Sequence, residues 1–205
     1  MKKLFIIAII LIVSNLIYAQ DTNKTIKVGK YSLSEATITS GKGPLTSGLD
    51  TRFDFSNGKN GVLFLQANSD RATIHFGRKF GNFKLLESFG VYKNMIWTGP
   101  MLLYKLGPLD FMVWNGVIFA KTDLLEVSGF NPQFFMSYES IGLTFFKNNR
   151  IGGSILYFGQ TPMNWFVSYK RTINIGEKSK LFAEVTYNRN LDIPMFVIGY
   201  TMKFQ

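Results

Sequence analysis

The segment 193–204 alternates strictly between two kinds of side chain, and this alternation limits the possible fold more than any other feature of the sequence. One face carries Phe196, Ile198, Tyr200, Met202 and Phe204. The other carries Met195, Val197, Gly199, Thr201 and Lys203. A period of two places successive side chains on opposite faces of a β-strand. The segment therefore predicts a strand that lies between two different environments.

Neighbouring segments match in register, which tests this prediction because a shift by one residue would turn every side chain to the opposite face. A turn at 189–192 pairs Asn188 with Ile193 and brings the apolar faces of the last two strands together. Turns at 56–61 and 68–71 do the same for the first strands. The turn at 68–71 aligns Leu63 with Phe76, Leu65 with Ile74 and Ala67 with Ala72. The series indicates an antiparallel arrangement of consecutive hairpins.

Eleven strands are predicted, separated by turns rich in Gly, Asn, Asp and Pro. They lie near 47–56, 61–68, 72–80, 83–92, 95–106, 109–120, 133–146, 150–159, 164–173, 180–188 and 193–204. A twelfth could lie within 25–39, where Tyr31 and Leu33 alternate with serines, although this stretch could equally be a flexible leader. Bacterial single-chain barrels use an even number of strands, so the count is 12 or 10.

Residues 1–19 have the pattern of a secretory signal peptide. Two lysines precede an uninterrupted apolar run from Leu4 to Val13, and Ala19 is a small residue at the expected cleavage site. This run is shorter than the ~20 residues that a membrane-spanning helix needs. We expect an exported chain in which 20–46 form a polar leader, which could contain the first strand, and 47–205 form the barrel.

Composition excludes several classes of site. The chain has no Cys and one His, which excludes a disulfide framework, a cysteine nucleophile and a multi-histidine metal centre. We therefore expect no metal and no cofactor. The net charge of +10 comes from basic residues spread over many turns, whereas nucleic-acid binding requires them on one patch or helix. We expect these residues to meet lipid phosphates at the membrane rims, and we expect no nucleic-acid partner.

What covers the apolar faces decides between two kinds of barrel. They point inward in a soluble barrel and meet lipid in a membrane barrel. Here the apolar faces are rich in aromatic residues and the basic residues concentrate in turns, which favours lipid. The segments 95–106 and 109–120 are apolar on both faces. They indicate either a filled interior or an apolar cavity lined by Trp97, Met101 and Trp114, and they keep the soluble alternative open.

The export signal, the hairpin series and an amphipathic last strand that ends on Phe204 resemble the outer-membrane β-barrel class of diderm bacteria. The junction Tyr18-Ala19-Gln20 looks like those common in the Bacteroidota. The chain departs from the class in ending on Gln205 and in having short loops on both sides. The resemblance implies a location in the cell outer membrane, contact with outer-membrane lipid and insertion by barrel-assembly machinery. The predicted fold is an all-β, antiparallel, up-and-down transmembrane β-barrel of about 12 strands (alternatively 10), joined by short turns.

Polar side chains on the faces opposite the apolar ones are the candidates for the lumen. They are Asp50, Arg52, Asp54, His75, Lys170 and Glu184. In the predicted register His75 lies across from Phe64, and Phe64 lies across from Asp54. The imidazole and the carboxylate are thus two strand spacings apart, about 10 Å. No Ser is placed to complete a hydrolytic site, so we assign no catalytic residue and expect an ordinary lumen residue at His75.

The predicted register also places Lys170 directly opposite Glu184, where a cross-strand ion pair would be natural. Two interpretations follow. Opposite charges neutralise one another and hold a filled barrel closed, or they form a charged constriction that selects ions. The first is favoured because small barrels are usually filled by side chains.

The function predicted from the sequence is structural, or a narrow passive pore in the outer membrane, without enzymatic chemistry. The alternative is a soluble periplasmic or secreted barrel, similar to lipocalins, that binds a hydrophobic ligand. A third hypothesis is a lipid-modifying barrel enzyme that uses His75. The sequence does not identify the permeant solute or the ligand.

Overall fold

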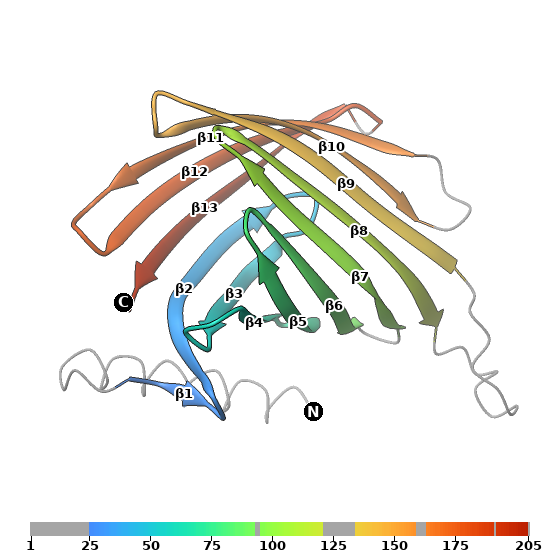
Figure 1. Cartoon of the computed structure of the whole chain (residues 1–205). Coiled ribbons are helices and arrows are strands. Elements are labelled where there is room, and N and C mark those ends of the chain that lie inside the picture. Colours follow the sequence, from blue (N-terminus) through green and yellow to red (C-terminus); the bar gives the residue numbers. More distant parts are fainter. Residues whose placement is uncertain (1–24, 93–94, 121–133, 159–162, 191, 205) are drawn as a thin grey trace, which may run out of the picture.

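The computed structural model is a closed antiparallel barrel (Figure 1). It describes residues 25–92, 95–120, 134–158, 163–190 and 192–204. The barrel strands are β2 (Tyr31–Lys42), β3 (Ser47–Ser56), β4 (Gly61–Asn68), β5 (Arg71–Phe80), β6 (Phe83–Tyr92), β7 (Met95–Leu106), β8 (Leu109–Ala120), β9 (Phe134–Phe145), β10 (Asn149–Phe158), β11 (Asn164–Asn174), β12 (Ser179–Asn188) and β13 (Ile193–Lys203). Consecutive strands pair with each other, and β13 pairs with β2 to close the barrel. A further strand of two residues, β1 (Lys27–Val28), pairs with the start of β2.

The strand pattern agrees with the sequence prediction. The eleven strands expected from residue 47 onward match β3–β13, with bounds that differ by about one residue, as is usual at element ends. The twelfth strand, β2, falls in the segment 20–46 that could equally have been a flexible leader. The alternative of ten strands is therefore wrong. The predicted signal peptide, 1–19, lies outside the described residues.

The predicted register of the hairpins is confirmed. Asn188 pairs with Ile193, and Ala67 pairs with Ala72. The row of three residues across β3, β4 and β5 is also as expected, with Asp54 opposite Phe64 and Phe64 opposite His75. Because register and alternation agree in every one of these hairpins, each strand has one face toward the lumen and one face toward the outside.

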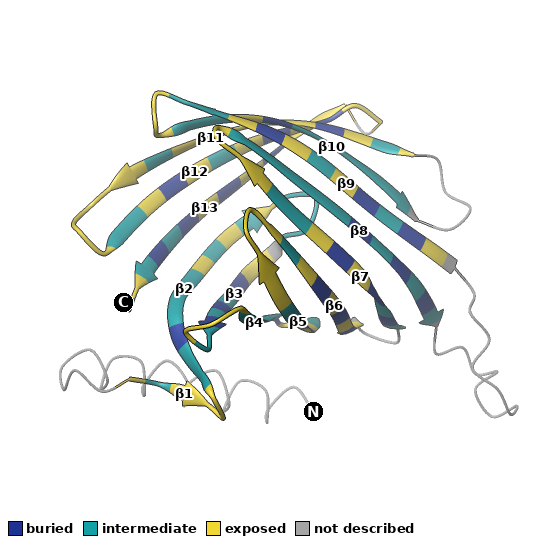
Figure 2. Cartoon of the chain, viewed as in Figure 1, coloured by how far each residue is buried: buried dark blue, intermediate teal, exposed yellow. Residues whose placement is uncertain are grey.

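The outward faces carry exposed apolar side chains. Figure 2 shows buried and exposed residues alternating along the strands, as a barrel wall requires. Val167 is 61% exposed, and Phe196 and Ile198 are each 59% exposed. Monomeric soluble proteins rarely expose so continuous an apolar surface. The wall is thus suited to an apolar surrounding.

One part of the outward face is covered by the chain itself. Leu33, Phe53, Phe55 and Leu63 form a buried cluster there, against which Ile26, Tyr31 and Phe204 pack. The register of β2 against β3 is irregular between Leu33 and Glu35, which marks a β-bulge at the start of β2. The first described residues and the end of β13 therefore secure the place where the barrel closes.

Candidate functional site: the barrel interior

Apolar side chains fill the part of the lumen enclosed by β4–β9. The buried cluster comprises Val62, Phe64, Leu86, Trp97, Met101, Trp114, Ile118, Met136 and Tyr138. The rings of Trp97 and Trp114 meet edge to face, with centroids 6.2 Å apart. Trp97 also lies flat against Gly90, where an added Cβ would clash with the indole. Trp97, Met101 and Trp114 are thus packed residues, which is the filled interior and not the apolar cavity that we also considered.

The rest of the lumen holds a polar cavity of about 400 Å³. Side chains from β2, β3, β4 and β9–β13 line it. Its charged lining residues are Glu35, Asp50, Arg52, Asp54, Arg150, Lys170 and Glu184. Five of the six predicted lumen residues are therefore brought together around one cavity, and only His75 lies elsewhere. Both signs of charge are present, so the cavity wall is mixed in charge.

The most buried ion pair of the lumen joins Asp50 on β3 to Arg71 on β5. Arg71 Nη2 lies 2.5 Å from Asp50 Oδ2, and Gln66 Nε2 donates to the same oxygen at 3.1 Å. The side chains of Arg71 and Asp50 are 14% and 2% exposed. A charge buried this deeply is stable only when it is paired and hydrogen-bonded. The alternation of β3 placed Asp50 in the lumen but did not indicate Arg71 as its partner.

A second ion pair spans three strands and depends on a glycine. Arg150 on β10 binds Asp110 on β8 with two hydrogen bonds, Nε to Oδ2 at 2.9 Å and Nη2 to Oδ1 at 2.6 Å. Between them lies Gly142 on β9, where an added Cβ would clash with the guanidinium group. The absence of a side chain at Gly142 lets Arg150 reach across the intervening strand. The sequence prediction missed this pair.

The expected ion pair between Lys170 and Glu184 is wrong, although the two residues are directly opposite in register. The three ion pairs among the described residues join other groups. Lys170 Nζ lies 3.6 Å from the centroid of the Phe182 ring, in a cation–π arrangement. Phe182 in turn lies over Gly199, its partner in register on β13. Glu184 is left facing the cavity.

His75 has a serine partner, which corrects the expectation that none was available. Its Nδ1 is 2.7 Å from Ser88 Oγ, on the residue directly opposite in β6. His75 is 5% exposed and Ser88 is fully buried, with the Trp114 ring 5.8 Å from the imidazole. Neither residue lines the polar cavity. The pair is accounted for as a satisfied polar contact beside the apolar cluster.

The connection between β2 and β3 lies against the polar cavity. Residues 43–46 all line the cavity, and the N–H of Gly43 donates to the carbonyl of Thr46 at 2.9 Å. Leu45 packs against the apolar cluster on the far side of the lumen. This connection lies at the barrel end opposite to the start of β2 and the end of β13. It therefore narrows the lumen at that end.

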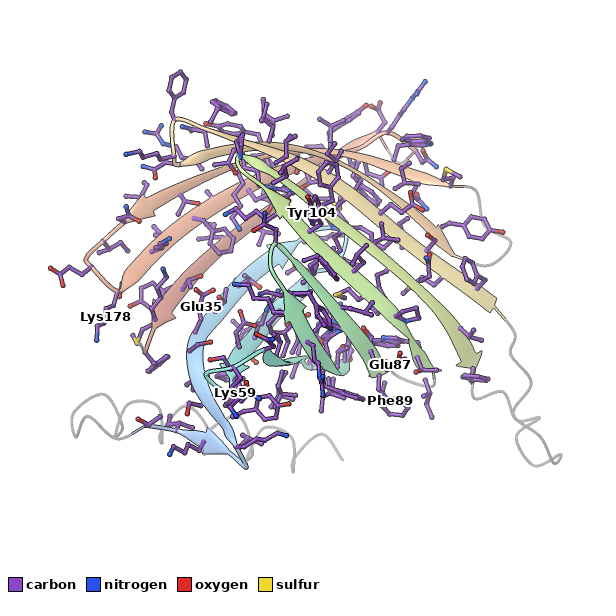
Figure 3. The ribbon with its side chains drawn as sticks, viewed as in Figure 1. Glu35, Lys59, Glu87, Phe89, Tyr104 and Lys178 are labelled. Carbon is purple, nitrogen blue, oxygen red and sulfur yellow. The ribbon has the colours of Figure 1, made fainter. Side chains whose placement is uncertain are left out.

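Two carboxylates interrupt the apolar outward face. Glu87, midway along β6, is exposed beside Phe89 (Figure 3), and it accepts a hydrogen bond from Thr98 Oγ1 at 3.1 Å. Glu139, midway along β9, is also exposed and accepts a bond from Ser137 Oγ at 3.4 Å. A charged group at this level of a lipid-facing wall is unfavourable. The effect of these carboxylates on stability therefore depends on whether hydrocarbon or water surrounds the barrel.

Replacing Glu87 with leucine is expected to raise the free energy of unfolding from lipid vesicles by about 1–2 kcal/mol, because the penalty for Glu at mid-membrane is smaller than the ~2–4 kcal/mol of Arg or Lys. The matched control is Arg78→Leu, on the outward face near the end of β5, where the change is expected to be under about 1 kcal/mol. Urea titrations of both variants measure the difference. If Glu87→Leu gave no gain over the control, the outward face would not meet hydrocarbon.

None of the described residues forms a helix long and apolar enough to cross a membrane. Within the same part of the chain, no group of three or more His, Cys, Asp or Glu side chains could hold a metal ion.

The fold is similar to that of solved porins. The KdgM porin aligns with a TM-score of 0.52 and 12% sequence identity over 84% of this chain and 99% of the porin chain. The KdgM porin in complex with disordered oligogalacturonate aligns equally well, with a TM-score of 0.52, 13% identity and the same coverage. The fold is that of the KdgM-type outer-membrane barrels. At this identity the likeness concerns the fold alone. No protein-family model and no curated protein sequence matches the chain.

Proposed function

We propose that the protein is a narrow, passive and non-enzymatic pore of the outer membrane for small polar solutes. The observation that carries the proposal is the polar cavity of about 400 Å³ inside a barrel whose outside is apolar. A polar lumen within an apolar wall is the arrangement of porin-type barrels. The likeness in fold to the KdgM porin supports the same location, in the outer membrane.

The soluble, ligand-binding alternative has less support. It needs an apolar cavity, whereas Trp97, Met101 and Trp114 are packed against one another in the lumen. It also needs a polar exterior, whereas Val167 and Phe196 are among many large apolar residues exposed on the outward face. A barrel of this kind in water would present an extensive surface for aggregation.

The mixed charge of the cavity indicates which solutes could pass. One of the similar porin structures is a complex with disordered oligogalacturonate, which is anionic. In this chain the cavity wall includes the carboxylates of Glu35 and Glu184 beside Lys170, and apolar side chains fill part of the lumen. An anionic polymer would meet both repulsion and a narrow path. We therefore expect small neutral or zwitterionic solutes.

Three further points rest on the sequence. Export by residues 1–19 and insertion by barrel-assembly machinery stay predictions. The source in the Bacteroidota, suggested by Tyr18-Ala19-Gln20, has no support from the similar porin structures.

Single-channel recording in planar bilayers tests the pore. The wild-type barrel is expected to conduct weakly, and Ser168→Trp, which places an indole in the cavity, is expected to reduce the conductance by roughly half or more. The control is Ala183→Trp, at an exposed outward position on β12, which should conduct like the wild type. A folded barrel without any conductance would instead support a purely structural role.

A further inference from the structure

An apolar groove of about 540 Å³ crosses the outward face over β8–β12, separate from the lumen. Its walls include Ile141, Ile155, Trp165 and Val167, all of them apolar side chains that face away from the barrel interior. Apart from its two ends, described below, the groove offers little polar surface. It is therefore suited to a hydrocarbon chain.

Gly153, midway along β10, lies between Ile141 and Val167 on the middle strand of the groove. An added Cβ at this position would meet only the carbonyl oxygen of Phe166, at 3.9 Å, which is ordinary van der Waals contact. The lack of a side chain at Gly153 is thus not required by the packing of the wall. Its effect is to leave space on the outward face between the walls of the groove.

The two ends of the groove differ in charge. Arg189 follows the end of β12 at the barrel rim, where its N–H donates to the carbonyl of Trp165 at 3.1 Å. The ion pairs of the described residues do not include Arg189. Glu139 lines the groove midway along β9, three strands away from β12, which Arg189 follows. Tyr187, another groove residue, donates its hydroxyl to Asp192 near the same rim, so Arg189 is the groove residue that can bind an anionic headgroup there.

We propose that the groove binds one acyl chain of a phosphate-bearing anionic membrane lipid, with its phosphate at Arg189. The proposal rests on the membrane placement in the proposed function, but it is independent of conductance. The chain lies over Gly153 between the apolar walls, and the guanidinium group binds the phosphate oxygens at the rim. A basic residue at the membrane surface favours an anionic over a zwitterionic lipid by roughly fivefold.

The test is native mass spectrometry of the full chain released from vesicles of equimolar phosphatidylglycerol and phosphatidylcholine. The wild type is expected to retain one lipid, with phosphatidylglycerol preferred by roughly fivefold. Gly153→Leu fills the hollow without a backbone clash and should abolish retention. Arg189→Gln should keep the retained chain but reduce the preference to about one. Ala183→Leu adds the same side chain as the first variant at an exposed position outside the groove, and should behave as the wild type.

Three results would overturn the proposal: a wild type that retains no lipid, Gly153→Leu with undiminished retention, or Arg189→Gln with an unchanged preference. Each variant is first shown to be folded by its electrophoretic mobility with and without heating. Conductance is recorded on the same preparations. A barrel that retains phosphatidylglycerol without conducting refutes the pore alone, and a conducting barrel without bound lipid refutes the groove alone.

Discussion

Arg71→Met is expected to lower the free energy of unfolding by about 3–5 kcal/mol, the largest loss among the predicted variants. Asp50, the partner of Arg71, is 2% exposed, and it also accepts a hydrogen bond from Gln66 Nε2 at 3.1 Å. Removing the guanidinium group leaves a buried carboxylate without its counter-charge. The free energy of unfolding lost in this way is much larger than the net contribution of the ion pair to stability. Urea titration in lipid vesicles, followed by tryptophan fluorescence, measures the loss.

The matched control is Arg52→Met, which breaks the pair with Asp54 on the same strand. Arg52 is 43% exposed, so water replaces its charge and the loss is expected to stay below about 1 kcal/mol. The double variant Asp50→Leu with Arg71→Met provides a second check. Because an apolar pair of similar volume can replace a buried ion pair at little cost, it should recover most of the stability. Equal losses for Arg71→Met and Arg52→Met would show that burial of Asp50 does not matter.

Leu86→Ala is expected to lower the free energy of unfolding by about 2–5 kcal/mol. Leu86 is 1% exposed and lies within the apolar cluster that fills part of the lumen. The loss combines the transfer of the removed methyl and methylene groups with the cavity that they leave. Because this cavity opens inside the barrel, the variant also tests whether the lumen is packed as tightly as a protein core.

The adjacent residue, Leu85, gives the control, because it points outward from the same strand and is 50% exposed. In a lipid bilayer Leu85→Ala reduces the apolar surface that contacts hydrocarbon. No cavity forms, because lipid fills the space that the side chain leaves. Its loss should be at most about half that of Leu86→Ala. If the two variants lost equal stability, the assignment of the inward and outward faces of β6 would be wrong.

Local patterns predicted the strands and their partners well. Alternation within 193–204 and the short turn at 189–192 determine both the strand and its register. A shift by one residue would turn Phe196 from the outward face to the lumen. The same reasoning placed Phe64 opposite His75. Such rows involve only adjacent strands, whose spacing is the same in every sheet. This is why alternation and turn length are sufficient to derive them.

Side-chain contacts were not predictable, even between residues that are directly opposite in register. Ser88 follows from register, yet its bond to His75 depends on the side-chain rotamers of both residues. Lys170 turns to the ring of Phe182, two positions from its own cross-strand row, and leaves Glu184 unpaired with it. Long side chains have several staggered conformations of similar energy, and the neighbouring volume selects among them.

The sequence by itself determined the barrel, its strand order and the lumen-facing position of Asp50, Arg52 and Asp54. These features depend on a period of two and on turn length. Only the tertiary structure decided which part of the lumen is filled and which is open. Arg150 on β10 binds Asp110 on β8 because the two strands flank β9 and Gly142 has no side chain to fill the space between them. Side-chain volume inside a closed wall is shared among strands far apart in sequence, and no single segment encodes how it is divided.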